Sequence, residues 1–124
     1  MKSERWIKGT AHREKLFGEK ASVVPRLEKI FPPLADAIVE FAFGDVHARP
    51  ALDVKTREML IVAMLVARGD TEMELRSHIR AALKTGVTKE ELFELFLQSA
   101  VYCGFPRAVN ATFLADEIFQ EQNA

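Results

Sequence analysis

The sequence predicts an all-α protein that forms a single domain of about six helices. No segment shows the alternation of apolar and polar residues that is typical of strands, and helix start and stop signals recur along the chain. The length of 124 residues matches one domain. We expect the domain to span residues 1–124, with peripheral N-terminal helices over 1–43 and a core region over 44–122.

The N-terminal third carries two helical patterns. Residues 3–17 are charged with a few apolar positions, which predicts a peripheral helix. Residues 22–43 continue the helical spacing, but Pro32 and Pro33 interrupt it. Because proline lacks the amide donor and clashes with the preceding turn, this segment should form two helices.

A loop is expected at residues 44–53. Gly44 can end the preceding helix, and Asp53 can cap the helix that follows. That next helix should cover about 54–68 and end at Gly69.

Two capping signatures begin the next pair of helices. Thr71 with Glu74, and Thr88 with Glu91, fit the Ser/Thr-x-x-Glu capping box, in which each residue bonds the other's backbone amide. The first of these helices should end at Gly86. The second should end at Gly104, and Pro106 suits the first turn of a last helix.

Two helices carry more apolar surface than one small domain can cover. The segment MLIVAMLVA, residues 59–67, is apolar around its whole circumference, and residues 92–103 come close. A helix that is apolar all round must be buried all round. We therefore predict a homo-oligomer, and the alternative is a central hairpin wrapped by the other helices of one chain.

Composition excludes several classes of protein. The net charge is −1 and no basic block occurs, so the electrostatic footprint of a nucleic-acid-binding protein is missing. The longest apolar run is far shorter than the roughly 20 residues of a membrane span. Cys103 is the only cysteine, which fits a reducing compartment. With no apolar core of a signal peptide near the first residues, we expect a cytoplasmic protein.

Glu74 and His78 form the first candidate site. They stand four positions apart, so on a helix they stack and can form a hydrogen bond. A carboxylate beside an imidazole fixes its tautomer and makes a common acid/base unit, but such pairs are also often plain surface pairs. Arg80 points about 200° away from His78 around the helix, given 3.6 residues per turn. The residues alone leave the two interpretations open.

Further candidates lie nearby in the sequence. His47 and Arg49 belong to the predicted loop, where functional groups are over-represented. Arg57 stands in the first turn of a helix that soon becomes apolar, where it either reaches water, pairs with an acid or binds substrate. One Glu and one His do not complete a three-ligand metal set, so no metal site is expected.

Taken in order, several motifs resemble one family. The segment FGDVHARPALDVKTREMLIVAMLVA, then ELRSHIRAALKTGVTKEELFELFLQSAVYCGFPRAVNATFLADEIF, resembles the carboxymuconolactone decarboxylase family. The resemblance covers about Phe43 to Phe119 and implies the all-α fold of the alkylhydroperoxidase AhpD. It also implies a homo-oligomer, a trimer or a hexamer.

The resemblance separates two kinds of chemistry. The peroxidase branch carries a Cys-x-x-Cys motif, and Thr71 and Glu74 stand at those two positions here. Disulfide exchange needs an attacking and a resolving thiol, so that redox reaction is excluded at this site. The other branch resembles γ-carboxymuconolactone decarboxylase of protocatechuate degradation, a reaction that needs no cofactor.

This second branch implies roles for individual residues. His78 would be the general acid or oxyanion donor, and Glu74 its orienting partner. The candidate contacts to the carboxylated lactone substrate are His47, Arg49, Arg57 and Arg80.

Two departures from the family pattern fall in the loop that is expected to line the pocket. His47 stands where the decarboxylases usually have Trp, and Ala51 replaces their usual Gly. A related lactone or β-keto-type acid is therefore an alternative substrate. Two alternative functions also stay open. One is a thiol oxidoreductase that uses Cys103 between subunits, and the other is a non-catalytic ligand-binding oligomer.

Overall fold

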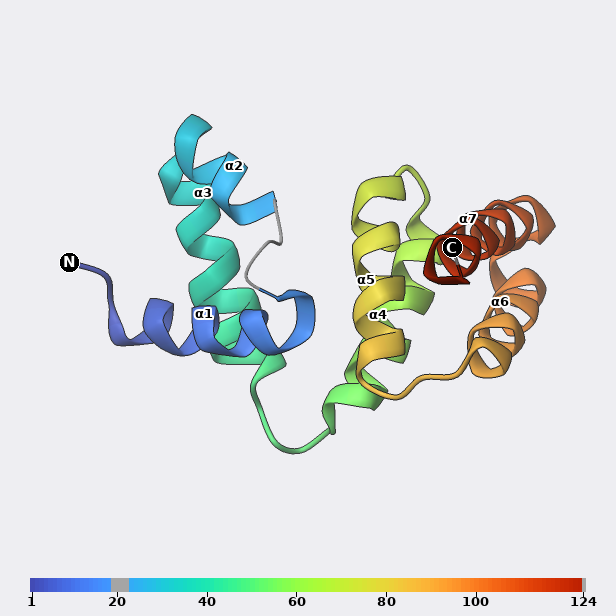
Figure 1. Cartoon of the computed structure of the whole chain (residues 1–124), viewed down its shortest axis with the longest axis horizontal. Coiled ribbons are helices and arrows are strands. Elements are labelled where there is room, and N and C mark those ends of the chain that lie inside the picture. Colours follow the sequence, from blue (N-terminus) through green and yellow to red (C-terminus); the bar gives the residue numbers. More distant parts are fainter. Residues whose placement is uncertain (19–22, 124) are drawn as a thin grey trace. The chain divides into compact units, whose positions relative to one another are not determined.

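A computed structural model describes residues 1–18 and 23–123 of the chain (Figure 1). Within those ranges it contains seven α-helices, one π-helix and no strand, which confirms the all-α prediction. The chain divides into two compact units, Met1–Val54 and Lys55–Ala124. Among the described helices, none combines the length and hydrophobicity that a membrane span requires.

The N-terminal unit is built from three α-helices and the π-helix. Helix α1 (Glu4–Phe17) begins at Ser3, whose hydroxyl accepts a hydrogen bond from the Trp6 amide at 3.0 Å. The second predicted segment is broken before its prolines, into α2 (Val23–Ile30) and α3 (Pro32–Ala37), and its first residue, Ser22, lies outside the described residues. The π-helix η1 (Ile38–His47) follows α3 directly.

Two glycines let α1 and η1 cross in backbone contact. A Cβ on Gly9 would overlap the carbonyl oxygen of Val39, and a Cβ on Gly44 would lie 2.7 Å from the carbonyl oxygen of Arg5. The Arg5 side chain then reaches Asp45 of η1 at 2.6 Å. This hydrogen bond lowers the pKa of the Asp45 carboxyl, so the link is strongest when Asp45 is ionised.

The prediction that Gly44 ends a helix is wrong. Gly44 is buried inside η1, which continues to His47, so the irregular stretch begins only after that residue. The physical reason is the crossing with α1, because Gly44 provides room for another backbone rather than a helix stop. A tertiary contact thus overrides the local rule for glycine.

The C-terminal unit contains four longer helices. They are α4 (Val54–Arg68, whose first residue closes the N-terminal unit), α5 (Glu72–Lys84), α6 (Lys89–Cys103) and α7 (Phe105–Asn123). Gly69 and Gly104 adopt positive φ values of 72° and 96° at helix ends, as expected. The core side chains that are almost fully buried include Val62, Ile79, Leu92, Phe96 and Ile118.

Only one of the two predicted capping boxes forms. Thr88 accepts a hydrogen bond from the Glu91 amide at 3.0 Å, and the Glu91 carboxylate accepts one from the Thr88 amide at 3.0 Å. At the start of α5 the prediction is wrong, because the Thr71 hydroxyl donates to the Leu65 carbonyl oxygen instead. The tight α4–α5 connection brings that carbonyl within reach.

We expect Thr88→Ala to lower the free energy of unfolding by about 1 kcal/mol, because it removes the side-chain acceptor of the α6 cap. Urea denaturation measures the loss. Thr88→Ser keeps a hydroxyl at the same position and should stay within a few tenths of a kcal/mol of the unaltered protein. An equal loss for both variants would contradict the capping interpretation.

Candidate active site

A buried carboxylate and an imidazole meet inside the C-terminal unit. Glu58 lies in the first half of α4, and His78 lies in the middle of α5. The Nδ1 atom of His78 is 2.8 Å from Oε2 of Glu58. The Glu58 side chain is 0 % exposed and the His78 side chain is 15 % exposed, so the two groups interact in a largely water-free environment.

The partner predicted for His78 is therefore corrected. Glu74 lies on the exposed surface of α5, and the carboxylate at His78 Nδ1 belongs to Glu58. The physical reason is the cost of burying an ionised acid, which must be compensated by a nearby donor. Glu74 can be solvated, so it does not compete for the imidazole.

The Glu58–His78 contact determines which ring nitrogen can react. With Glu58 ionised, its carboxylate accepts this hydrogen bond, and Nδ1 of His78 carries the hydrogen that points at it. The other nitrogen, Nε2, is then the atom able to exchange a proton with a bound molecule. A carboxylate that orients an imidazole in this manner also balances the charge of the doubly protonated ring.

Sequence reasoning missed Glu58. The available signal was a single acid at the beginning of the apolar segment EMLIVAMLVA, where an ionisable group has to be buried with the rest of the helix face. A buried acid on a core-forming helix is a candidate for function because its environment can tune proton transfer.

The predicted substrate contacts are divided between the two units. Arg57 is half-buried beside Glu58 on α4, and Arg80 is exposed on α5, where its guanidinium donates to Glu121 of α7 at 2.8 Å. His47 and Arg49 belong to the N-terminal unit, in which His47 is buried at the end of η1 and Arg49 is exposed.

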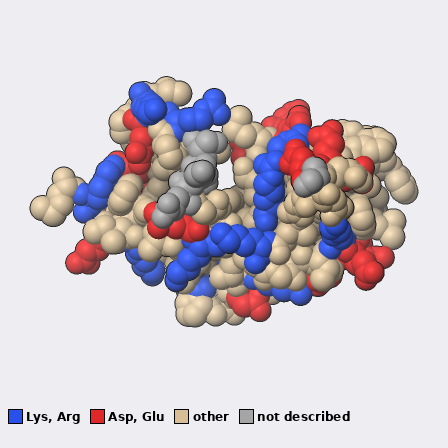
Figure 2. All heavy atoms as spheres, viewed as in Figure 1, with Lys and Arg blue, Asp and Glu red and all other residues tan. Residues whose placement is uncertain are grey.

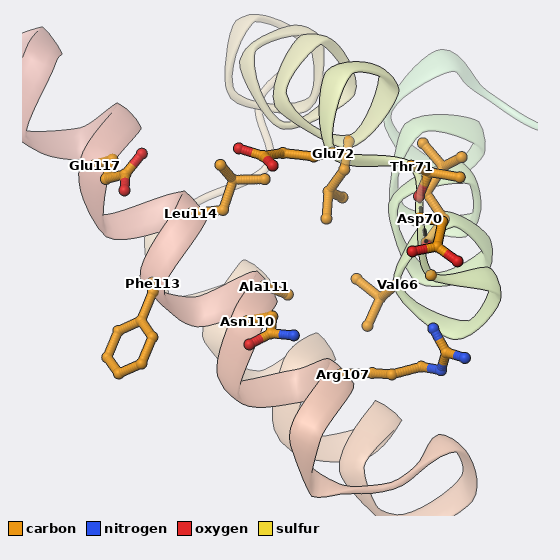
Figure 3. A pocket seen from close by; sticks show the side chains of 13 residues that line it. Val66, Asp70, Thr71, Glu72, Arg107, Asn110, Ala111, Phe113, Leu114 and Glu117 are labelled. Carbon is orange, nitrogen blue, oxygen red and sulfur yellow. Dashed lines mark hydrogen bonds between the residues drawn. The ribbon is translucent and has the colours of Figure 1, made fainter.

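A hollow of about 400 Å³ lies between the α4–α5 connection and α7 (Figure 3). Its apolar lining includes Val66 and Leu114, while Arg107 extends along one side. Two of its acids, Glu72 and Glu117, accept hydrogen bonds from Arg76, and Glu117 contributes most to raising the pKa of that guanidinium.

Cys103 lines a second hollow, of about 700 Å³, on the side of α6 that faces α4. The thiol is half-buried, and Met59 and Tyr102 line the same hollow. His78 lines neither of these two hollows.

Figure 2 shows Lys and Arg side chains as well as Asp and Glu side chains on the face that it draws. Within the described residues, no three His, Cys, Asp or Glu side chains gather in a manner that could hold a metal ion.

Comparisons with known proteins show which family this chain resembles. A family model described as the carboxymuconolactone decarboxylase family matches residues 32–117. The chain is 37 % identical over 120 residues to a 4-carboxymuconolactone decarboxylase of Acinetobacter baylyi, covering 95 % of this chain and 89 % of the relative.

Two further relatives extend the comparison. A nitrosuccinic acid decarboxylase of Metarhizium robertsii is 35 % identical over 89 residues, which are 72 % of this chain and 62 % of the relative. An uncharacterized 15.0 kDa protein of Paracoccus denitrificans is 32 % identical over 98 residues, or 78 % and 73 % of the two chains. By the family model and by these relatives, the chain belongs to the carboxymuconolactone decarboxylase family.

Proposed function

We propose that this protein is a carboxy-lyase that removes CO2 from a small dicarboxylic acid such as 4-carboxymuconolactone. The buried Glu58–His78 pair is the observation that carries the proposal, because it supplies an oriented proton donor in a site shielded from water. Family membership and two relatives that are named decarboxylases support the same reaction class.

The two named substrates share one chemical pattern. In both, the saturated carbon that carries the leaving carboxylate also bears a carboxymethyl arm and is attached to an electron-accepting system. The acceptor is the unsaturated lactone carbonyl in one acid and the nitro group in the other. We therefore propose, as the substrate class, dicarboxylic acids whose decarboxylation leaves a negative charge on oxygen.

The reaction can be written for the lactone with all electrons accounted for. The bond between the γ-carbon and the carboxylate breaks, and its electron pair moves through the ring double bond onto the lactone carbonyl oxygen. The products of this step are CO2 and a furanolate anion. Protonation at the α-carbon then completes the reaction, which consumes one proton and needs no external electron acceptor.

His78 would supply that proton. In its doubly protonated form the ring keeps one hydrogen on Nδ1, bound by Glu58, and offers the other from Nε2. It stabilises the oxyanion by hydrogen bonding and then transfers the proton to carbon. Solvent must return a proton to the ring before the next cycle.

The remaining predicted residues would bind the carboxylates of the substrate. We assign this role to Arg49, Arg57, Arg80 and His47, in keeping with the bidentate geometry that guanidinium offers to carboxylate. Arg57→Ala should raise KM about tenfold with a smaller change in kcat, because it removes binding that is shared by the ground state and the transition state. Steady-state kinetics measures this difference, and Arg68→Ala, at the far end of α4, is the matched control.

We further propose that the protein acts as a homo-oligomer, a trimer or a hexamer, in the cytoplasm. Several large apolar side chains are strongly exposed along α6 and the first half of α7. They are Leu97 (60 %), Val101 (70 %), Tyr102 (82 %), Phe105 (69 %) and Phe113 (67 %). An apolar surface of this extent is typical of a protein interface.

Val101→Glu is expected to yield a smaller species in light scattering coupled to size-exclusion chromatography, because it places a charge among these exposed apolar side chains. Gln98→Glu adds the same charge on α6 without removing an apolar group and should have a smaller effect. An unchanged mass for Val101→Glu, or a monomeric unaltered protein, would contradict the proposed interface.

The proposed function is tested by CO2 release from 4-carboxymuconolactone and from nitrosuccinic acid. We expect turnover with at least one of them, and strong loss of turnover in His78→Ala with binding largely kept. Binding without turnover would identify a non-catalytic ligand-binding protein instead. Peroxide consumption that is abolished by Cys103→Ser would favour the thiol alternative.

A further inference from the structure

A second pair of ring nitrogens meets in the N-terminal unit. Nε2 of His12, on α1, is 2.6 Å from Nδ1 of His47, the last residue of η1. The ring centroids are 4.8 Å apart. His47 is 5 % exposed, so this hydrogen bond is largely removed from water.

The crossing of the two helices produces this contact. His12 lies three residues after Gly9, and His47 lies three residues after Gly44, so each histidine is close to one turn beyond the point where the backbones touch. Phe43 stacks on the His47 ring, with centroids 5.6 Å apart and planes inclined by 23°. His47 is thus held by a ring on one side and by a hydrogen bond from the other helix.

At this separation one hydrogen must lie between the two nitrogens. Two lone pairs would repel each other, and two N–H groups would clash. The hydrogen belongs either to His12 Nε2 or to His47 Nδ1, and in the neutral pair this choice decides whether Nε2 of His47 is a donor or an acceptor. The contact therefore links the protonation pattern of His47 to a residue 35 positions away in the sequence.

Arg13 lies near the pair. The Arg13 guanidinium lies 5.3 Å from the Phe43 ring that stacks on His47, and it adds positive charge on this side of α1. Its burial lowers the pKa of Arg13. On η1 the neighbouring acid, Asp45, is bound by Arg5.

We propose that His12 is a positioning residue of the decarboxylase, which fixes the tautomer and the ring orientation of His47 for substrate binding. This inference rests on the proposed function, in which His47 contacts the substrate. In a histidine with a fixed tautomer, Nε2 is always a hydrogen-bond donor or always an acceptor. In a ring that exchanges its tautomers, Nε2 alternates between the two. His12 would thereby contribute to the selection of the carboxylate or carbonyl group that this position binds.

The test combines NMR spectroscopy with kinetics on the full chain. His12→Phe keeps a ring but removes the nitrogen, and His12→Asn restores one polar group able to reach His47. Lys15→Ala, an exposed change on the same helix, is the control. Long-range ¹H–¹⁵N spectra of the His47 ring report which nitrogen carries the hydrogen, and 4-carboxymuconolactone serves as the kinetic substrate.

We expect a single tautomer of His47 in the unaltered protein and a mixed pattern in His12→Phe. The KM of His12→Phe should rise about tenfold with a smaller fall in kcat, and His12→Asn should restore part of both readouts. An unchanged His47 spectrum in His12→Phe, or an unchanged KM, would overturn the proposal.

The outcome is separable from that of the proposed function. Absence of CO2 release from the unaltered protein would refute the decarboxylase assignment. The dissociation constant of the lactone, measured by calorimetry, would then take the place of KM. Together with the His47 spectrum, it would still decide whether His12 positions a ligand-binding histidine.

Discussion

Glu58→Gln should lower kcat by about 10²- to 10⁴-fold, although it changes the side chain by one atom. The amide cannot balance the charge of a doubly protonated His78, and its NH2 group can donate to Nδ1 and so favour the wrong tautomer. Steady-state decarboxylation kinetics measures the loss. Glu58→Asp keeps the charge at a shorter reach and should retain more activity than Glu58→Gln.

Glu74→Gln is the matched control for this experiment. It makes the same chemical change to an exposed acid one turn before His78, and its kcat should stay within about twofold, as is usual for surface positions. Circular dichroism of each variant separates loss of chemistry from loss of fold. A larger loss of kcat for Glu74→Gln than for Glu58→Gln would restore the pairing that local sequence spacing predicts.

Gly9→Ala should destabilise the protein by about 3 kcal/mol or more, because the new methyl group would overlap the Val39 carbonyl oxygen. Backbone on both sides of the contact leaves no flexible side chain to move away. The expected sign is informative, since Gly→Ala inside a helix ordinarily stabilises by about 1 kcal/mol. Chemical denaturation provides the free energy of unfolding.

Gly18→Ala controls for the general effect of adding a methyl group. No atom lies within 4 Å of a Cβ at Gly18, whose φ is 77°, so only the cost of left-handed backbone, about 1 kcal/mol, is expected. The Gly9→Ala substitution should also affect the histidine pair, because separating α1 from η1 would break the hydrogen bond between His12 and His47. A stabilised Gly9→Ala variant would contradict the close crossing of these helices.

Helix boundaries that depend on local chemistry could be predicted from the sequence. Ser3, the Thr88–Glu91 capping box and Gly104 act within one or two turns of their own position, so the bounds of α1 and α6 follow from neighbouring residues. The family also followed from motif order, and the comparisons confirm it. Two helices were expected over 22–43, but the described part of this region forms three elements, α2, α3 and η1, and η1 continues to His47.

The errors share a physical cause, which is a tertiary contact that outcompetes a local one. Gly44 has the usual properties of a helix stop, but the crossing with α1 uses it inside η1. Thr71 has the spacing of a capping box, but its hydroxyl donates a hydrogen bond to the Leu65 carbonyl oxygen. Glu74 has the spacing of a partner for His78, but Nδ1 of His78 contacts the carboxylate of the buried Glu58 instead.

The central claim, that His78 delivers the proton to carbon, is tested most directly by decarboxylation of 4-carboxymuconolactone in D2O. We predict that the product, analysed as it forms, carries one deuterium in a single configuration at the protonated α-carbon. Residual turnover by His78→Ala should give both configurations equally, because solvent then delivers the deuteron to either face. Stereospecific deuteration that persists unchanged in His78→Ala would show that another group delivers the proton.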